Sequence, residues 1–232
     1  MQKHSPADYL EDLKKEFEIQ GDPERAQGQM AYMRHQFEYY GLRAPEWTAI
    51  VKAYYREHGI FSGEELKDFV VLCYNEDHRE IHYASIEMVQ MAQKKKDPEL
   101  TGLLEWIITH HSWWDTVDWV SKLVGIQFRH FPDQINPVTE RWIYGKHLWL
   151  QRAAIIFQLL YRDKTDQDLL FRYILHVKDS KEFFLQKAAG WALRNYSRVN
   201  PDAVIEFTAQ NQLAPLTRRE ALRLIYPKKV KP

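Results

Sequence analysis

Apolar side chains recur at spacings of three and four residues along most of the chain, while the strict alternation of apolar and polar residues that marks β-strands is nearly absent. Spacings of three and four place side chains on one face of an α-helix. Glycine, which weakens helices, occupies only 9 of the 232 positions. The pattern predicts an all-α protein in which one helix follows another.

Proline marks the first helix starts. Asp22 followed by Pro23 combines a capping side chain with proline at the first helical position. This helix is expected to run to about Tyr39 and to stop before Gly41. Pro45 is expected to begin the next helix.

Further capping signals divide the rest of the chain. Ser62 and Glu65 fit a capping box in front of the apolar stretch 66–74. Later starts are expected at Asp97-Pro98, Phe131-Pro132 and Asn200-Pro201. Together these signals predict about a dozen helices of roughly 10–18 residues, joined by short turns.

A series of short helices of similar length is typical of antiparallel helix pairs stacked as a solenoid, with a repeat of roughly 35–45 residues. Tryptophans at 113–114, 149 and 191 recur near that period, although the sequence shows no clean internal repeat. A globular helix bundle is the competing architecture. No linker rich in proline, glycine or serine divides the chain, so we expect one domain over residues 1–226 and a basic tail at 227–232.

Signals for membranes, export and disulfides are missing from the sequence. No apolar run reaches the roughly 18 residues of a membrane helix, and residues 1–9 lack the basic and apolar regions of a signal peptide. The single cysteine, Cys73, excludes an intramolecular disulfide and lies in the apolar run 69–74, where a packed thiol is favoured over a nucleophile. A soluble cytoplasmic protein is therefore expected.

The net charge is zero, but the charges are unevenly distributed. Residues 1–116 hold 13 Lys and Arg against 21 Asp and Glu, whereas residues 117–232 hold 19 against 11. An excess of positive charge indicates a surface that can bind a polyanion such as nucleic acid. The alternative is a chance division of ordinary solvated helix faces.

The most unusual segment is 110–118, which contains two adjacent tryptophans and two aspartates. On a helix, Trp114 and Asp118 are four residues apart, so an indole and a carboxylate share one stripe. An aromatic face attracts cations, and a carboxylate can stabilise an oxocarbenium-like sugar when a glycosidic bond breaks. The alternative is that both tryptophans belong to the core and that Asp115 and Asp118 cap a helix.

Metal and nucleotide motifs are not found. His110 and His111 are adjacent, so they point to different faces of a helix and lack the spacing of paired metal ligands. The sequence contains no HExxH, phosphate-binding loop or dinucleotide glycine motif. We therefore expect a protein without a metal or an organic cofactor.

Basic residues lie within two apolar helical segments of the C-terminal half. Arg152 interrupts the apolar stretch 148–157, where it forms either a buried structural pair or a phosphate contact. Lys187, Trp191 and Arg194 are spaced i, i+4 and i+7, so two cations flank an indole on one helix face. This pattern suits a DNA backbone surface, although a core tryptophan beneath basic side chains would give it too.

Several long sequence strings, taken together, resemble the AlkD-like DNA alkylation-repair proteins. The strings are MAYM at 30–33, GLRAPE at 41–46, SWWDTVD at 112–118, LWLQRAAIIFQLLY at 148–161, SKEFFLQKAAGWALRNY at 180–196, and NPDAVIEF with LAPLTRREALR within 200–223. They occur in the family's order and cover nearly the whole chain. The resemblance implies a HEAT-like helical-repeat solenoid whose concave face holds duplex DNA.

The resemblance also implies an activity, namely excision of positively charged N3- and N7-alkylated purines such as 3-methyladenine and 7-methylguanine. The enzyme would be a monomeric, monofunctional DNA glycosylase of base excision repair without a cofactor, associated with the nucleoid when it acts on DNA. The alternative is a non-catalytic HEAT-like module that binds damaged or branched DNA.

Site residues follow from the same resemblance. Trp114, Asp118 and Trp191 match the family's catalytic positions, while Arg152 and Tyr32 match residues of the DNA cleft. The spacing described above adds Lys187 and Arg194 as candidate DNA contacts. In this interpretation Asp118 stabilises the developing sugar cation, the tryptophans contact the deoxyribose and Arg152 holds a backbone phosphate.

Overall fold

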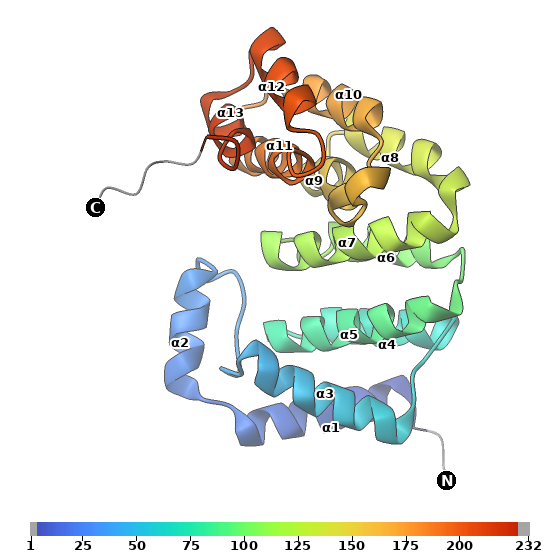
Figure 1. Cartoon of the computed structure of the whole chain (residues 1–232). Helices are drawn as coiled ribbons and strands as arrows, with labels where there is room; N and C mark the ends of the chain where they lie inside the picture. The colour runs from blue at the N-terminus through green and yellow to red at the C-terminus, as the bar shows by residue number, and fades with distance from the viewer. Residues whose placement is uncertain (1–3, 227–232) are drawn as a thin grey trace. The chain divides into compact units, whose positions relative to one another are not determined.

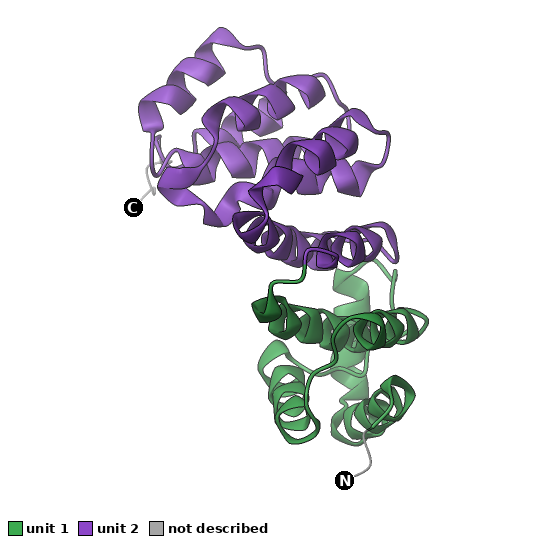
Figure 2. Cartoon of the chain, turned by 90° about the vertical axis from the view of Figure 1, so that its right-hand side faces the viewer, with its two compact units in different colours: residues 1–97 green, residues 98–232 purple. Residues whose placement is uncertain are grey.

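The computed structural model describes residues 4–226, and in this range it contains thirteen α-helices, four short 3-10 helices and no β-strand. The all-α prediction is therefore confirmed. The chain consists of two compact units, residues 1–97 and 98–232 (Figure 2). The single domain expected over residues 1–226 stays a prediction.

Unit 1 is a small group of helices packed around an aromatic and aliphatic core. Its helices are α1 (Pro6–Gln20), α2 (Pro23–Tyr32), α3 (Ala44–His58), α4 (Glu64–Tyr74) and α5 (Arg79–Ala92), followed by the 3-10 turn Gln93–Lys95. Helix α4 packs against α1 and α5, and α3 also packs against α5, while α2 runs across the direction of the other helices (Figure 1). Fully buried side chains such as Phe17, Val51 and Phe69 form the core.

Unit 2 consists of four consecutive helix pairs. The pairs are α6 (Leu100–Thr109) with α7 (Trp114–His130), α8 (Ile135–Tyr144) with α9 (Leu148–Ile156), α10 (Gln167–Val177) with α11 (Phe183–Tyr196), and α12 (Pro201–Gln210) with α13 (Pro215–Ala221). Three 3-10 turns lie at Pro132–Gln134, Phe157–Leu160 and Arg162–Lys164. The second helices of the pairs pack in order, α7 on α9, α9 on α11 and α11 on α13. Repeated helix pairs are the architecture that the short helices predicted.

The close approach between α11 and α13 depends on Gly190. A Cβ at this position would lie 2.6 Å from the Cβ of Glu220 and 2.9 Å from the carbonyl oxygen of Thr217. Only a hydrogen fits in that space. The hydroxyl of Thr217 donates to the carbonyl of Gln186, 3.1 Å away, and fastens the two helices together.

Three predicted helix starts are confirmed at their residues, whereas α6 begins two residues after Pro98 and Pro132 begins a 3-10 turn ahead of α8. Two further local predictions are wrong. Helix α2 ends at Tyr32 rather than near Tyr39, because Arg34 and His35 adopt left-handed φ angles of 57° and 55° that no α-helix can continue. Helix α4 begins at Glu64 with a glycine as its N-cap. The predicted Ser62 capping box is therefore absent.

Other helix starts agree with their sequence signals. Pro45 lies in the first turn of α3, and the side chain of Asn200 accepts a hydrogen bond from the backbone N–H of Ala203 at the start of α12. None of the helices described is both long and apolar enough to cross a membrane. The basic tail predicted at 227–232 lies outside the described residues.

Candidate functional site

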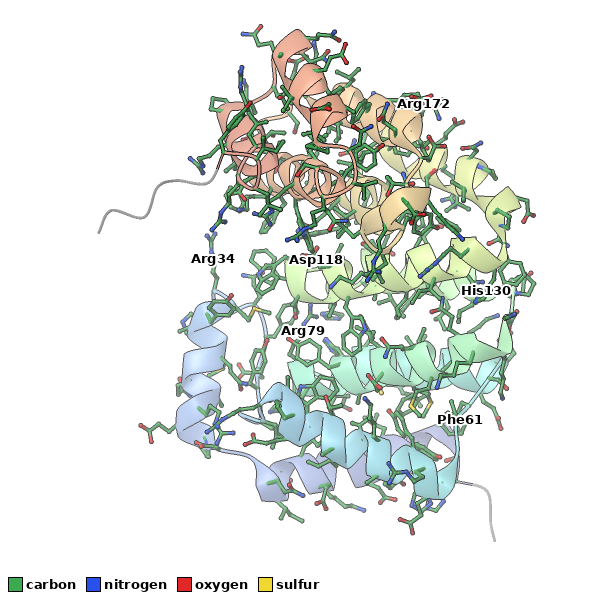
Figure 3. All side chains as sticks on the ribbon, viewed as in Figure 1. Arg34, Phe61, Arg79, Asp118, His130 and Arg172 are labelled. Carbon is green, nitrogen blue, oxygen red and sulfur yellow. The ribbon has the colours of Figure 1, made fainter. Side chains whose placement is uncertain are left out.

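Helix α7 carries the first part of the candidate site. It begins at Trp114, with Trp113 as N-cap in an extended conformation, so Trp114, Asp118 and Lys122 follow one another at four-residue intervals on a single stripe. Asp118 lies in the first half of α7, and His130 marks the other end of this helix (Figure 3). The alternative interpretation, in which Asp115 caps the helix, is wrong because Trp113 occupies that position.

Arg152 on α9 donates hydrogen bonds to both carboxylate oxygens of Asp118. The Nε of Arg152 donates to Oδ1 at 2.7 Å, and its Nη2 donates to Oδ2 at 2.9 Å. Such a two-point pair fixes the plane of the carboxylate as well as its position. The Arg152 side chain is 6% exposed and that of Asp118 is 16% exposed. The pair is thus mostly buried, and the carboxylate keeps a limited opening to solvent.

A third hydrogen bond fixes the guanidinium itself. The Nη1 of Arg152 donates to the carbonyl of Phe184 in α11 at 2.6 Å, and the guanidinium carbon lies 5.9 Å from the centre of the Phe184 ring. Phe184 in turn packs against Trp113 and Trp149, with ring centres 5.3 and 4.9 Å apart. Of the two alternatives for Arg152, the structure shows the buried pair. A phosphate contact stays a prediction, since three of the five N–H groups donate within the protein.

Trp191 on α11 lies close to the same stripe of α7. The Nζ of Lys122, one turn beyond Asp118, is 5.9 Å from the centre of the Trp191 ring. The half-buried indole therefore faces a cation from α7. The sequence interpretation missed Lys122, although extending the spacing of Trp114 and Asp118 by four more residues would have found it.

The predicted cations Lys187 and Arg194 converge on Glu220 of α13. The carboxylate lies 3.2 Å from the Nζ of Lys187, 2.8 Å from Nη1 of Arg194 and 3.9 Å from Nη1 of Arg223. Burial alone would raise the pKa of Glu220, but the hydrogen bond from Lys187 and the three positive charges lower it overall. The DNA contacts predicted for Lys187 and Arg194 stay predictions, and Glu220 was not anticipated from the sequence.

Tyr32 belongs to unit 1, where it is the last residue of α2 and is 73% exposed. Asp118, Arg152 and Trp191 all belong to unit 2. The cleft role predicted for Tyr32 stays a prediction. No group of three or more His, Cys, Asp or Glu residues in the described part of the chain is arranged to hold a metal ion.

Comparison with known proteins identifies similar sequences and structures. A family model described as DNA alkylation repair enzyme matches residues 13–225. The structure of a predicted DNA alkylation repair enzyme from Enterococcus faecalis is similar with a TM-score of 0.83 and 31% identity, and the match covers 90% of this chain and 98% of that one. A search of curated proteins gave no match.

Two structures from Streptococcus mutans share the fold at lower identity. AlkD2 matches with a TM-score of 0.64 and 17% identity over 95% of this chain and 97% of that one. The smu.31 structure from strain UA159 matches with a TM-score of 0.59 and 18% identity over 81% of this chain and 92% of that one. The helical-repeat arrangement is thus shared well beyond close sequence similarity.

Proposed function

Because this chain belongs to the family of DNA alkylation repair enzymes, we propose that it is a monofunctional DNA glycosylase that releases N3- and N7-alkylated purines, such as 3-methyladenine and 7-methylguanine, from duplex DNA. The observation that carries the proposal is the carboxylate of Asp118. It is partly open to solvent and is held at both oxygens by the buried Arg152. A fixed carboxylate suits a reaction in which positive charge develops on a sugar.

The chemistry requires little acid catalysis. An N3- or N7-alkylated purine already carries a positive charge, so the electron pair of the broken glycosidic bond neutralises the departing base. The positive charge passes to the deoxyribose, where the Asp118 carboxylate stabilises it. Water then adds to the anomeric carbon, with Asp118 orienting it, and releases a proton, leaving an abasic site and a free base.

Arg152 acts in this proposal as the residue that positions Asp118. Two of its hydrogen bonds hold the carboxylate in one orientation before DNA arrives, and the third, to the carbonyl of Phe184, holds the guanidinium itself. No reorganisation is then needed as charge develops. The indole faces of Trp114 and Trp191 contact the deoxyribose by cation–π and CH–π attraction. Lys122, beside Trp191, adds positive charge for the DNA backbone.

The direct test is release of 7-methylguanine from alkylated duplex DNA by the purified protein, with and without a chelator. We expect release in both conditions, and no release of uracil, because uracil departs without a preformed positive charge. Binding of alkylated DNA without any base release would instead identify a non-catalytic DNA-binding module.

The Asp118→Asn variant tests the role of the carboxylate. It keeps the shape of the side chain but removes its charge, so we expect single-turnover excision to slow by roughly 10²–10³. DNA affinity should stay the same or increase slightly. Asp168→Asn, an exposed aspartate on α10, is the matched control and should retain the full rate. An unchanged rate in Asp118→Asn would remove Asp118 from the catalytic role.

A further inference from the structure

A basic hollow lies beside Trp191 in unit 2. Its volume is about 270 Å³, and its lining consists of Trp191, Arg194, Asn195, Arg198, Arg223 and Leu224. Three of these six residues are arginines and none is acidic. The hollow therefore joins one of the proposed sugar-contacting indoles to a concentration of positive charge.

The side chains around this hollow carry more positive than negative charge. Glu220 is shared by Lys187, Arg194 and Arg223, while Arg198 forms no ion pair within residues 4–226. Four cations against one carboxylate leave three positive charges in excess. An internal partner of this kind organises the cations without neutralising them.

Helix packing fixes the position of Glu220, which is not a freely moving surface side chain. Its side chain is 10% exposed, and the close approach at Gly190 brings α13 near enough for the carboxylate to reach Lys187 and Arg194 on α11. Long cationic side chains lose conformational entropy when they bind a ligand. Glu220 already restricts the cations beside this hollow in the folded protein. Less conformational entropy is therefore lost when an anion binds, which favours binding.

We propose that this hollow is a binding site for a DNA backbone phosphate, next to the sugar that contacts Trp191, with Glu220 as the internal counter-charge that keeps the site assembled. Guanidinium groups match the geometry of phosphate oxygens and donate paired hydrogen bonds to them. The assignment of the phosphate to DNA rests on the proposed function. The same chemistry could bind free inorganic phosphate, which the experiment separates.

Arg198→Gln removes the cation that forms no ion pair within residues 4–226. Because Arg198 is exposed, we expect the substitution to leave the fold intact. Affinity for a fluorescent, unmodified duplex is measured by anisotropy over a salt series. Loss of one phosphate contact should make the negative slope of log affinity against log salt shallower by about 0.9. Between roughly 50 and 200 mM salt, the factor by which affinity decreases should therefore be about three-fold smaller in the variant than in the wild type.

Arg172→Gln is the charge-matched control. Arg172 lies on α10, the first helix of its pair (Figure 3). It is exposed and forms an ion pair with Glu140 on α8. Its variant should keep the wild-type slope. An unchanged slope in Arg198→Gln, or an equal change in both variants, would overturn the proposal.

Two further measurements separate the possible failures. In the first, inorganic phosphate is titrated at constant ionic strength while tryptophan fluorescence is recorded. A fluorescence response that is lost in Arg198→Gln, together with an unchanged salt slope for DNA, would identify a site for free phosphate and contradict the proposal. Unmodified DNA requires no base excision. A chain that releases no 7-methylguanine but shows the expected slope change would therefore contradict the glycosylase and support the phosphate site.

Discussion

In unit 1 the buried carboxylate of Glu80 accepts hydrogen bonds from the backbone N–H groups of residues 40–42, at 2.9 to 3.1 Å, whereas in unit 2 the carboxylates of Asp118 and Glu220 are held by arginine and lysine side chains. The first arrangement shapes a loop. The second leaves a charged cluster that can interact with another charged molecule. Equivalent chemical groups thus serve the fold in one unit and the candidate site in the other.

Electrostatics separates the two arrangements. Burial raises the pKa of Glu80, and the backbone hydrogen bonds oppose this only in part. The cations around Glu220 lower its pKa despite burial. The distribution of charge agrees with this division, since residues 1–97 hold 13 Lys and Arg against 18 Asp and Glu, and residues 98–232 hold 19 against 14. Positive charge is concentrated in the unit that carries Asp118.

The largest expected effect concerns the two glycines that let these carboxylates reach their partners. Gly41 has a φ of 91°, and a Cβ there would lie 2.1 Å from the carbonyl oxygen of Asp22, so Gly41→Ala should lower the free energy of unfolding by about 4 kcal/mol through strain and overpacking. Gly190→Ala adds overpacking alone and should cost about 2 kcal/mol. Urea unfolding of both variants measures the difference, and a smaller loss for Gly41→Ala would contradict this ranking.

The next effect concerns the ion pair of unit 2. Arg152→Ala leaves the mostly buried Asp118 carboxylate without its cation and should destabilise the protein by about 3 kcal/mol. Excision should slow as well, because the carboxylate loses its fixed orientation. Adding Asp118→Asn to this variant should recover part of the stability but none of the activity. Additive losses of stability in the double variant would show that the two side chains do not depend on each other.

The smallest effect is a contrast in pH dependence. The folded-state pKa of Glu80 is raised above its ordinary 4.5, so its favourable contribution is complete below that pH and is lost as pH rises through the raised value. For Glu220 the pKa is lowered, so its contribution is present above 4.5 and is lost as pH falls through the lowered value. In urea unfolding at several pH values, the stability difference between wild type and Glu80→Gln should fall with rising pH, and that for Glu220→Gln should rise. Slopes of the same sign would remove the distinction between the two carboxylates.

The sequence by itself determined the helical class, the helix starts at Asp22-Pro23, Pro45 and Asn200-Pro201, and the placement of Trp114 and Asp118 on one stripe. These features depend on residues within about four positions of one another, which the helical period and capping chemistry relate directly. These local signals did not predict where α2 ends. Arg34 and His35 are not residues that require left-handed angles, so their conformation is not written in the local pattern.

Only the tertiary structure decided how the charged residues pair. Asp118 and Arg152 are 34 residues apart, and Arg194 and Glu220 are 26 apart, so each contact depends on how whole helices pack. Local sequence therefore left Arg152 between a buried pair and a phosphate contact, and it gave no indication of Glu220. Packing of α7 on α9 brought Arg152 to Asp118, and the space left by Gly190 brought Glu220 to the cations of α11.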